Sequence, residues 1–143
     1  MTGRLIDICV LGSWKCGSTS LVRYLKDKFP DKWVGKQEVF HMQDEKFQLH
    51  NNEPNCIYYV IIRKDLNEFY RSMWQFFYPE LEFRDFMELK DVRKTGMSVV
   101  ELGNWNKHIA RWEKKVKNLK VLFLEDMQKK DDFPHLNKTS DLP

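Results

Sequence analysis

The amino-acid sequence predicts an α/β protein with three layers, in which a central parallel sheet is flanked by helices on both faces. Apolar runs of strand length recur along the chain, and segments with helical periodicity separate them. One of these runs, 56–62, is continuous and rich in β-branched residues, which is typical of a strand buried on both faces. The chain has 143 residues, so we expect a single minimal domain over 1–143, with an irregular tail at 128–143.

The first half of the chain is expected to alternate strands with helices. The apolar run before residue 12 predicts a buried strand, and Pro30-Asp31 breaks the helical pattern that follows it. The segment 36–54 is polar and irregular. In order, the predicted elements are a strand at 5–11, a helix at 18–28, a short strand at 32–35, a short helix near 43–49 and the central strand at 56–62.

In the second half, helical segments precede one last strand. Asp65 is a suitable N-cap for a helix that Pro79 ends. From Val99 to Val116, apolar residues recur at three- and four-residue spacing, which indicates a longer helix. The predicted elements are helices at 65–77, 81–90 and 98–116, followed by a strand at 120–124.

Charge and cysteine content narrow the class of protein. The formal net charge is only +3, which is too balanced to indicate a nucleic-acid partner but suits a polyanionic ligand if lysines converge. Three cysteines at this spacing fit neither a disulfide framework nor a zinc site, and Cys9 and Cys56 fall in strands expected to be buried. No signal peptide or membrane-spanning run is seen, so we expect a soluble, cytoplasmic protein.

The most informative stretch, 12–20, reads Gly-Ser-Trp-Lys-Cys-Gly-Ser-Thr-Ser and joins the first strand to the first helix. A turn of small residues before a helix N-terminus can hold a phosphate-like anion, because the first N–H groups of the helix have no partner within it. Ser18 and Thr19 add hydroxyl donors, and Lys15 adds a positive charge. The alternative is an ordinary strand–helix turn with a solvated lysine.

The position of the lysine distinguishes this loop from the P-loop of nucleoside-triphosphate-binding proteins, in which the lysine follows the last glycine. Here Lys15 precedes Gly17, and no Gly-Lys-Ser/Thr triplet occurs in the chain. The loop resembles the 5′-phosphosulfate loop of sulfotransferases that use 3′-phosphoadenosine 5′-phosphosulfate (PAPS), which reads Lys-x-Gly-Ser-Thr or Lys-x-Gly-Thr-Thr. This resemblance implies a P-loop-like fold. The residues that it assigns to the cofactor are Lys15, Cys16, Gly17, Ser18, Thr19 and Ser20.

A second resemblance to the same family lies in 61–72. The family holds the 3′-phosphate of its cofactor with an arginine after a strand and a serine eight residues later. Ser72 lies eight residues after Lys64 and nine after Arg63, so either cation fills the role. A solvated basic pair beside a helix is the alternative.

A third resemblance covers 103–112 and 121–127. These segments are similar to the family's Gly-x-Tyr-x-x-x-Leu-x-x-Trp helix and to the next strand, which ends in Glu-Asp-Leu. Taken singly, such residues are more often core packing than chemistry. In this order and spacing they extend the resemblance over 5–127, as a short form of the family. The Gly-Ser-Thr-Ser version of the loop is closest to the carbohydrate sulfotransferases.

The resemblance implies transfer of a sulfuryl group from PAPS to an acceptor hydroxyl on a carbohydrate, without a metal. By analogy with phosphoryl transfer, the protein contributes positioning and electrostatic stabilisation. Lys15 would neutralise the leaving oxygen. Relatives place their base in the segment that holds Glu38 and His41, and either residue fits: heparan-type relatives use a glutamate, others a histidine, which titrates near neutrality.

Two other functions stay open at this point. One is a nucleotide-binding, P-loop-like protein of the kinase type, although the spacing of the Walker lysine is missing. The other is a catalytically silent binding module that kept the fold. Lys15, 36–41, 63–65 and Glu125 all follow predicted strands, so all three interpretations expect these residues to converge on one edge of the sheet.

Overall fold

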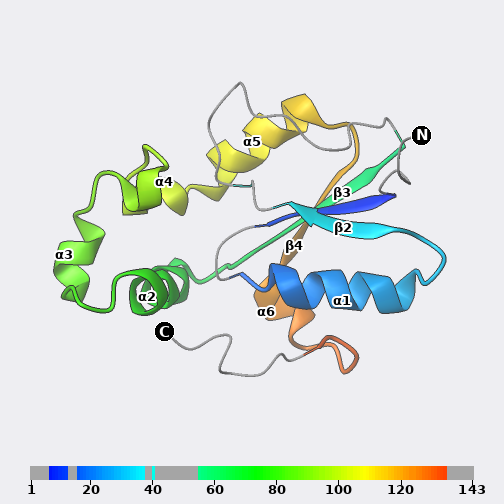
Figure 1. Cartoon of the computed structure of the whole chain (residues 1–143), viewed down its shortest axis with the longest axis horizontal. Helices are drawn as coiled ribbons and strands as arrows, with labels where there is room; N and C mark the ends of the chain where they lie inside the picture. The colour runs from blue at the N-terminus through cyan, green and yellow to red at the C-terminus, as the bar shows by residue number, and fades with distance from the viewer. Residues whose placement is uncertain (1–6, 13–15, 38–39, 41–54, 135–143) are drawn as a thin grey trace.

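The computed structural model describes residues 7–12, 16–37, 40 and 55–134. Within these residues, four strands form one all-parallel sheet in the order β2-β1-β3-β4 (Figure 1). The strands are β1 (Ile8–Leu11), β2 (Val34–Gln37), β3 (Ile57–Ile62) and β4 (Leu119–Phe123). Because β1 pairs in parallel with both β2 and β3, the first strand lies inside the sheet.

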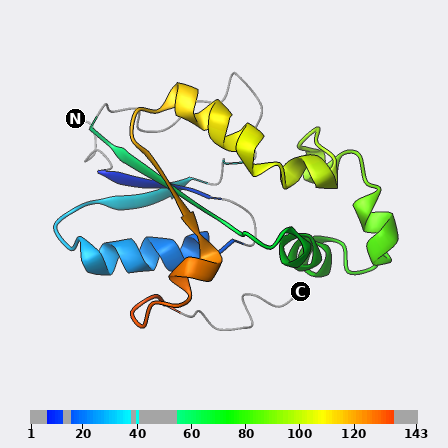
Figure 2. The same ribbon diagram turned by 180° about the vertical axis from the view of Figure 1, so that it is seen from behind.

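Helices cover both faces of the sheet, as Figures 1 and 2 show from opposite sides. The helices α1 (Ser18–Lys28) and α6 (Leu124–Met127) pack on one face, against Ile8, Val10 and Ile61. The helix α5 (Trp105–Lys115) packs on the other, against residues that alternate with these, such as Cys9 and Leu11. The predicted three-layer arrangement of helix, parallel sheet and helix is therefore confirmed.

A group of short helices lies beyond the carboxyl ends of the strands (Figures 1 and 2). It consists of α2 (Leu66–Phe77), α3 (Phe83–Met87), the 3₁₀ turn η1 (Val92–Lys94) and α4 (Val99–Leu102). Its core includes Phe69, Met73 and Phe86, and Cys16 from the β1–α1 loop is buried among them. We call this part the end group; its packing on Cys16 fixes it against the start of α1.

Several predicted elements differ from the structure. The helix expected at 81–90 is limited to α3, Phe83–Met87, and the helix expected near 43–49 lies outside the described residues. The second strand begins two residues later than expected, at Val34, and runs into the polar Lys36 and Gln37. It pairs with β1 on one side only, and an edge strand tolerates polar residues that a central strand does not. The polar residues at the end of β2 resemble a loop in composition, so the prediction ended this strand at residue 35 and not at Gln37.

The long helix expected at 98–116 is two helices, α4 and α5. The break lies at Gly103 and Asn104. A Cβ at Gly103 would collide with the Tyr70 hydroxyl and would lie 2.9 Å from the Leu66 side chain, so any larger residue here requires these side chains of α2 to shift. Asn104 then caps α5 by accepting a hydrogen bond from the Lys107 N–H, at 3.3 Å.

All three cysteines are buried thiols, and burial was predicted for Cys9 and Cys56. Burial, together with the neighbouring Cys56, raises the pKa of the Cys9 thiol to about 12. In the described part of the chain, every helix is too short or too polar to cross a membrane.

Candidate functional site

The carboxyl ends of β1 and β3 form the switch point of the sheet. From β1 the chain passes through α1 to β2 on one side, whereas the next strand, β3, lies on the other side of β1. In open parallel sheets, ligands bind where the connections of neighbouring strands diverge in this way. Gly12 follows β1 and Arg63 follows β3, so both predicted cofactor-binding turns begin here.

The first turn is shaped by Gly17, the N-cap of α1. Its backbone is left-handed, with φ 88°, and a Cβ at this position would lie 2.8 Å from the Leu124 side chain. Glycine cannot cap with a side chain, and the described first turn of α1 carries no acidic residue. The first N–H groups of α1 form a positive helix end, and this end therefore lies at the switch point.

Lys36 supplies a cation to this helix end. Its Nζ donates a hydrogen bond to Thr19 Oγ1 at 3.0 Å. Lys36 lies near the end of β2, opposite Val10 in the sheet, and its side chain is exposed. Sequence reasoning placed Lys36 in the segment 36–41 that was expected to converge on this edge of the sheet, but it did not assign Lys36 to the cofactor.

The other residues predicted for this loop differ in exposure. Cys16 is fully buried against the end group, so only its backbone is available to a ligand. Ser18 and Ser20 are buried at 7% and 8% exposure, whereas Thr19 is exposed. Lys15, Glu38 and His41, the predicted catalytic residues, lie outside the described residues.

Phe40, which stands between Glu38 and His41 in the sequence, is held by hydrogen bonds to its backbone. The Phe40 N–H donates to the Gly12 carbonyl at 3.1 Å. The Phe40 carbonyl accepts from Arg111 Nη2 at 2.7 Å and from Trp112 Nε1 at 3.0 Å. Phe40 is thus held between the start of the β1–α1 loop and α5.

The second turn joins β3 to α2 and is held by Glu125. The two carboxylate oxygens of Glu125 accept from the backbone N–H of Lys64 at 2.8 Å and of Asp65 at 2.9 Å. On the other side of the turn, Trp105 Nε1 donates to the Arg63 carbonyl at 2.7 Å. Desolvation disfavours the charged form of Glu125, but the two backbone donors outweigh it, so the pKa of this carboxyl is lowered.

The two cations of this turn have different surroundings. Lys64 Nζ lies 2.8 Å from Asp126 Oδ1 and 5.2 Å from the centre of the Phe123 ring. Its hydrogen bond is the main cause of the lowered pKa of Asp126. Arg63 is half-buried. Ser72 is partly buried on α2, and in the described part of the chain no hydrogen bond joins it to Arg63 or Lys64.

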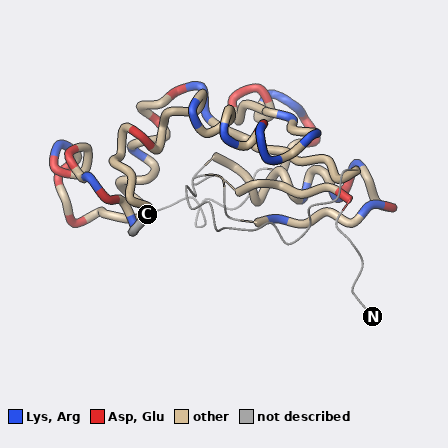
Figure 3. The backbone as a smooth tube through the Cα atoms, turned by 90° about the horizontal axis from the view of Figure 1, so that it is seen from above, with Lys and Arg blue, Asp and Glu red and all other residues tan. Residues whose placement is uncertain are grey.

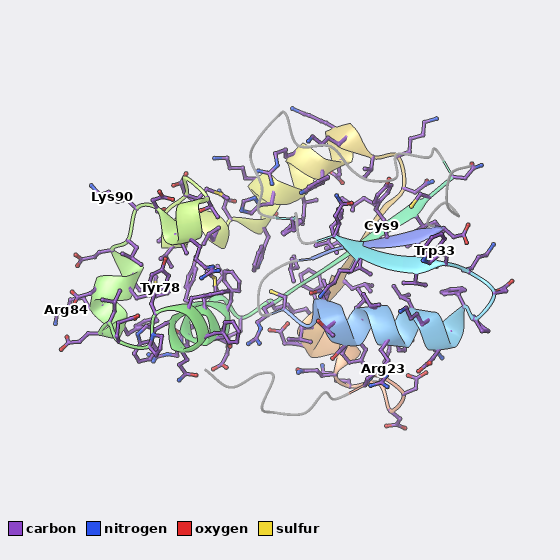
Figure 4. The ribbon with its side chains drawn as sticks, in the orientation of Figure 1. Cys9, Arg23, Trp33, Tyr78, Arg84 and Lys90 are labelled. Atoms are coloured by element: carbon purple, nitrogen blue, oxygen red, sulfur yellow. The ribbon has the colours of Figure 1, made fainter. Side chains whose placement is uncertain are left out.

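Two further features lie away from this site. A surface hollow of about 500 Å³ opens at the amino end of β2, lined by Lys26, Pro30, Lys32, Trp33 and Val34. Figure 4 shows Trp33 at the opposite side of the molecule from Tyr78, Arg84 and Lys90 of the end group. His108 on α5 is buried, with Nε2 3.0 Å from the Glu101 carbonyl, and burial lowers its pKa to about 4. Neither feature belongs to the switch point.

Along the described part of the backbone, basic and acidic positions are interspersed (Figure 3). Within the described residues, no cluster of three His, Cys, Asp or Glu side chains is arranged to hold a metal ion. The chain matches no family model, no curated protein and no solved structure.

Proposed function

We propose that this protein is a PAPS-dependent sulfotransferase of P-loop-like fold, which transfers a sulfuryl group to an acceptor hydroxyl on a carbohydrate. The observation that carries the proposal is the hydrogen bond between Lys36 and Thr19 at the N-terminus of α1. A cation beside a positive helix end is electrostatically unfavourable by itself. A bound anion reverses this, because the ammonium group and the helix N–H groups then stabilise the same negative charge.

The second turn supports a ligand with a second anionic group. Arg63 begins this turn at the carboxyl end of β3, next to β1 in the sheet. Arg63 directly follows β3, so we assign the contact with the 3′-phosphate to this residue. In this proposal the α1 end holds the 5′-phosphosulfate, and a nucleotide 3′,5′-bisphosphate spans the two turns.

The proposed chemistry is an in-line displacement at sulfur, in which negative charge grows on the bridging oxygen of the leaving nucleotide. Lys15 and Lys36 would stabilise that charge, because both belong to the segments that meet at the start of α1. Glu38 and His41 flank the anchored Phe40, and one of them would accept the proton of the acceptor hydroxyl. Such a base must come within hydrogen-bond reach of that hydroxyl.

Calorimetric titration with adenosine 3′,5′-diphosphate, the nucleotide product, tests the proposal. We expect Lys36→Met to weaken its binding by about tenfold or more, the effect of one lost charge-assisted hydrogen bond. Lys120→Met is the matched control, because Lys120 is an exposed lysine in the same row of the sheet, on the opposite edge strand. Its binding should change less than about twofold, within the usual range for surface substitutions.

Transfer itself is measured with radiolabelled PAPS and a panel of carbohydrate acceptors. Labelled product supports the proposal. If the nucleotide binds but no acceptor is labelled, the protein is a binding module instead. If ATP with Mg²⁺ binds and adenosine 3′,5′-diphosphate does not, the protein is of the kinase type and the sulfotransferase proposal is wrong.

A further inference from the structure

We propose that Leu124 and Glu125 of α6 set the spacing between the two anion-binding turns and thereby determine specificity for a 3′,5′-bisphosphate. This inference rests on the proposed function. It concerns residues that do not touch the ligand in that proposal, so both act as positioning residues.

Glu125 fixes the second turn. Its carboxylate spans two consecutive backbone N–H groups, those of Lys64 and Asp65, at 2.8 and 2.9 Å. Two bonds from one rigid carboxylate define both the position and the direction of the turn. The direction in which Arg63 leaves β3 follows from this, because Arg63 directly precedes the two held residues and its carbonyl is held by Trp105.

Leu124, the neighbouring residue, fixes the first turn. Its side chain is buried and lies so close to Gly17 that a Cβ there would be 2.8 Å away. Figures 1 and 2 both show α6 beside the beginning of α1. Two adjacent residues therefore contact both turns, and the short α6 bridges them at a fixed separation.

The electrostatic effect of Glu125 opposes its positioning effect, and this makes the inference testable. Glu125 and Asp126 are two carboxylates beside the proposed phosphate contact, with Arg63, Lys64 and Asp65 facing them from the second turn. On charge alone, neutralising either carboxylate strengthens binding of a phosphate. If Glu125 positions the turn, neutralising it must weaken that binding instead.

The experiment compares Glu125→Gln with Asp126→Asn in calorimetric titrations with adenosine 3′,5′-diphosphate, adenosine 2′,5′-diphosphate and AMP. Asp126→Asn removes the same charge but leaves the backbone bonds of the turn in place. We expect Glu125→Gln to lose the preference for the 3′,5′-isomer by about tenfold, as for a lost charge-assisted hydrogen bond, with AMP binding unchanged. Asp126→Asn should keep or increase the preference.

The outcomes separate this inference from the proposed function. If the unmodified protein does not distinguish the 3′,5′-isomer from AMP, the assignment of the 3′-phosphate contact fails. If it does, and Glu125→Gln behaves like Asp126→Asn, the positioning role is overturned. Should Glu125→Gln not fold, Glu125→Asp replaces it: the charge is kept, but the shorter side chain cannot reach both N–H groups. An unchanged preference in that variant also overturns the inference.

Discussion

A side chain at Gly17 would face both a left-handed backbone and a close neighbour. Comparison with a second glycine separates the energetic costs of these two effects. Gly17 and Gly96 both have positive φ, at 88° and 76°, but only Gly17 has a neighbour within reach of a Cβ. Gly96→Ala should therefore lower the free energy of unfolding by about 1–2 kcal/mol, the cost of a left-handed alanine. Gly17→Ala should cost about 1–3 kcal/mol more, because Leu124 must shift within a packed core.

Urea denaturation of the two variants measures this difference. Equal losses would show that Leu124 yields without cost and that the contact between α6 and α1 is loose. That result would also weaken the case for α6 as a fixed bridge.

Titration of the buried His108 should lower the free energy of unfolding at a higher pH than titration of the acidic residues does. Burial lowers its pKa to about 4, whereas an unfolded histidine has an ordinary pKa of about 6.5. Above pH 6.5 both states are neutral there and no stability is lost. As the pH falls from 6.5 towards 4, the unfolded state binds the proton first, so the free energy of unfolding should fall by about 2–3 kcal/mol.

Denaturation at pH 7.5 and pH 4.5 measures this loss, with His108→Gln as the control, since its amide can still donate to the Glu101 carbonyl. Most of the loss should disappear in the variant. The carboxyls of Glu101, Glu125 and Asp126 have lowered pKa values, so their contributions are lost at lower pH than that of His108. An identical pH profile in the variant would refute the assignment.

Among the elements, the corner between α4 and α5 depends on close contact with α2. Gly103→Ala should destabilise the protein by about 1–3 kcal/mol, as overpacking does, because its Cβ meets the Tyr70 hydroxyl. Tyr70→Phe removes that hydroxyl, together with its 3.3 Å hydrogen bond to the Val100 carbonyl. The double variant should therefore recover part of the loss, and thermal unfolding of all three variants measures this coupling. If the stability losses of the two single variants simply add in the double variant, the contact between residue 103 and Tyr70 is contradicted.

At the same scale, the elements show why some boundaries were predictable. Asp65 was recognised as an N-cap, and it accepts from the Glu68 N–H at 3.2 Å at the start of α2. The helix at 18–28 was also predicted correctly, because a turn of small residues precedes it and Pro30-Asp31 breaks the helical pattern after it. The break at Gly103 was missed, since a glycine inside a periodic segment does not reveal that Tyr70 will pack against it.

At the scale of the molecule, the central place of β3 in the sheet followed from composition. A continuous apolar run predicts a central strand, and β3 lies between β1 and β4. Convergence of 63–65 and Glu125 on one edge was also predictable, because both follow strands of a parallel sheet. The contact of Lys36 with Thr19 was not, since it depends on where a polar edge strand ends. Lys15, Glu38 and His41 stay predictions.

The three buried thiols lie in two different cores, so the reactivity of each thiol reports on the opening of its own core. Cys9 and Cys56 lie in the core between the sheet and α5, whereas Cys16 lies in the core of the end group. A thiol inside a packed core reacts only when that core opens. Alkylation followed by mass spectrometry should therefore label Cys16 first if the end group can swing away from an intact sheet. If acceptors enter by such a movement, a bound nucleotide that braces the β1–α1 loop will slow labelling of Cys16 more than that of Cys9 or Cys56.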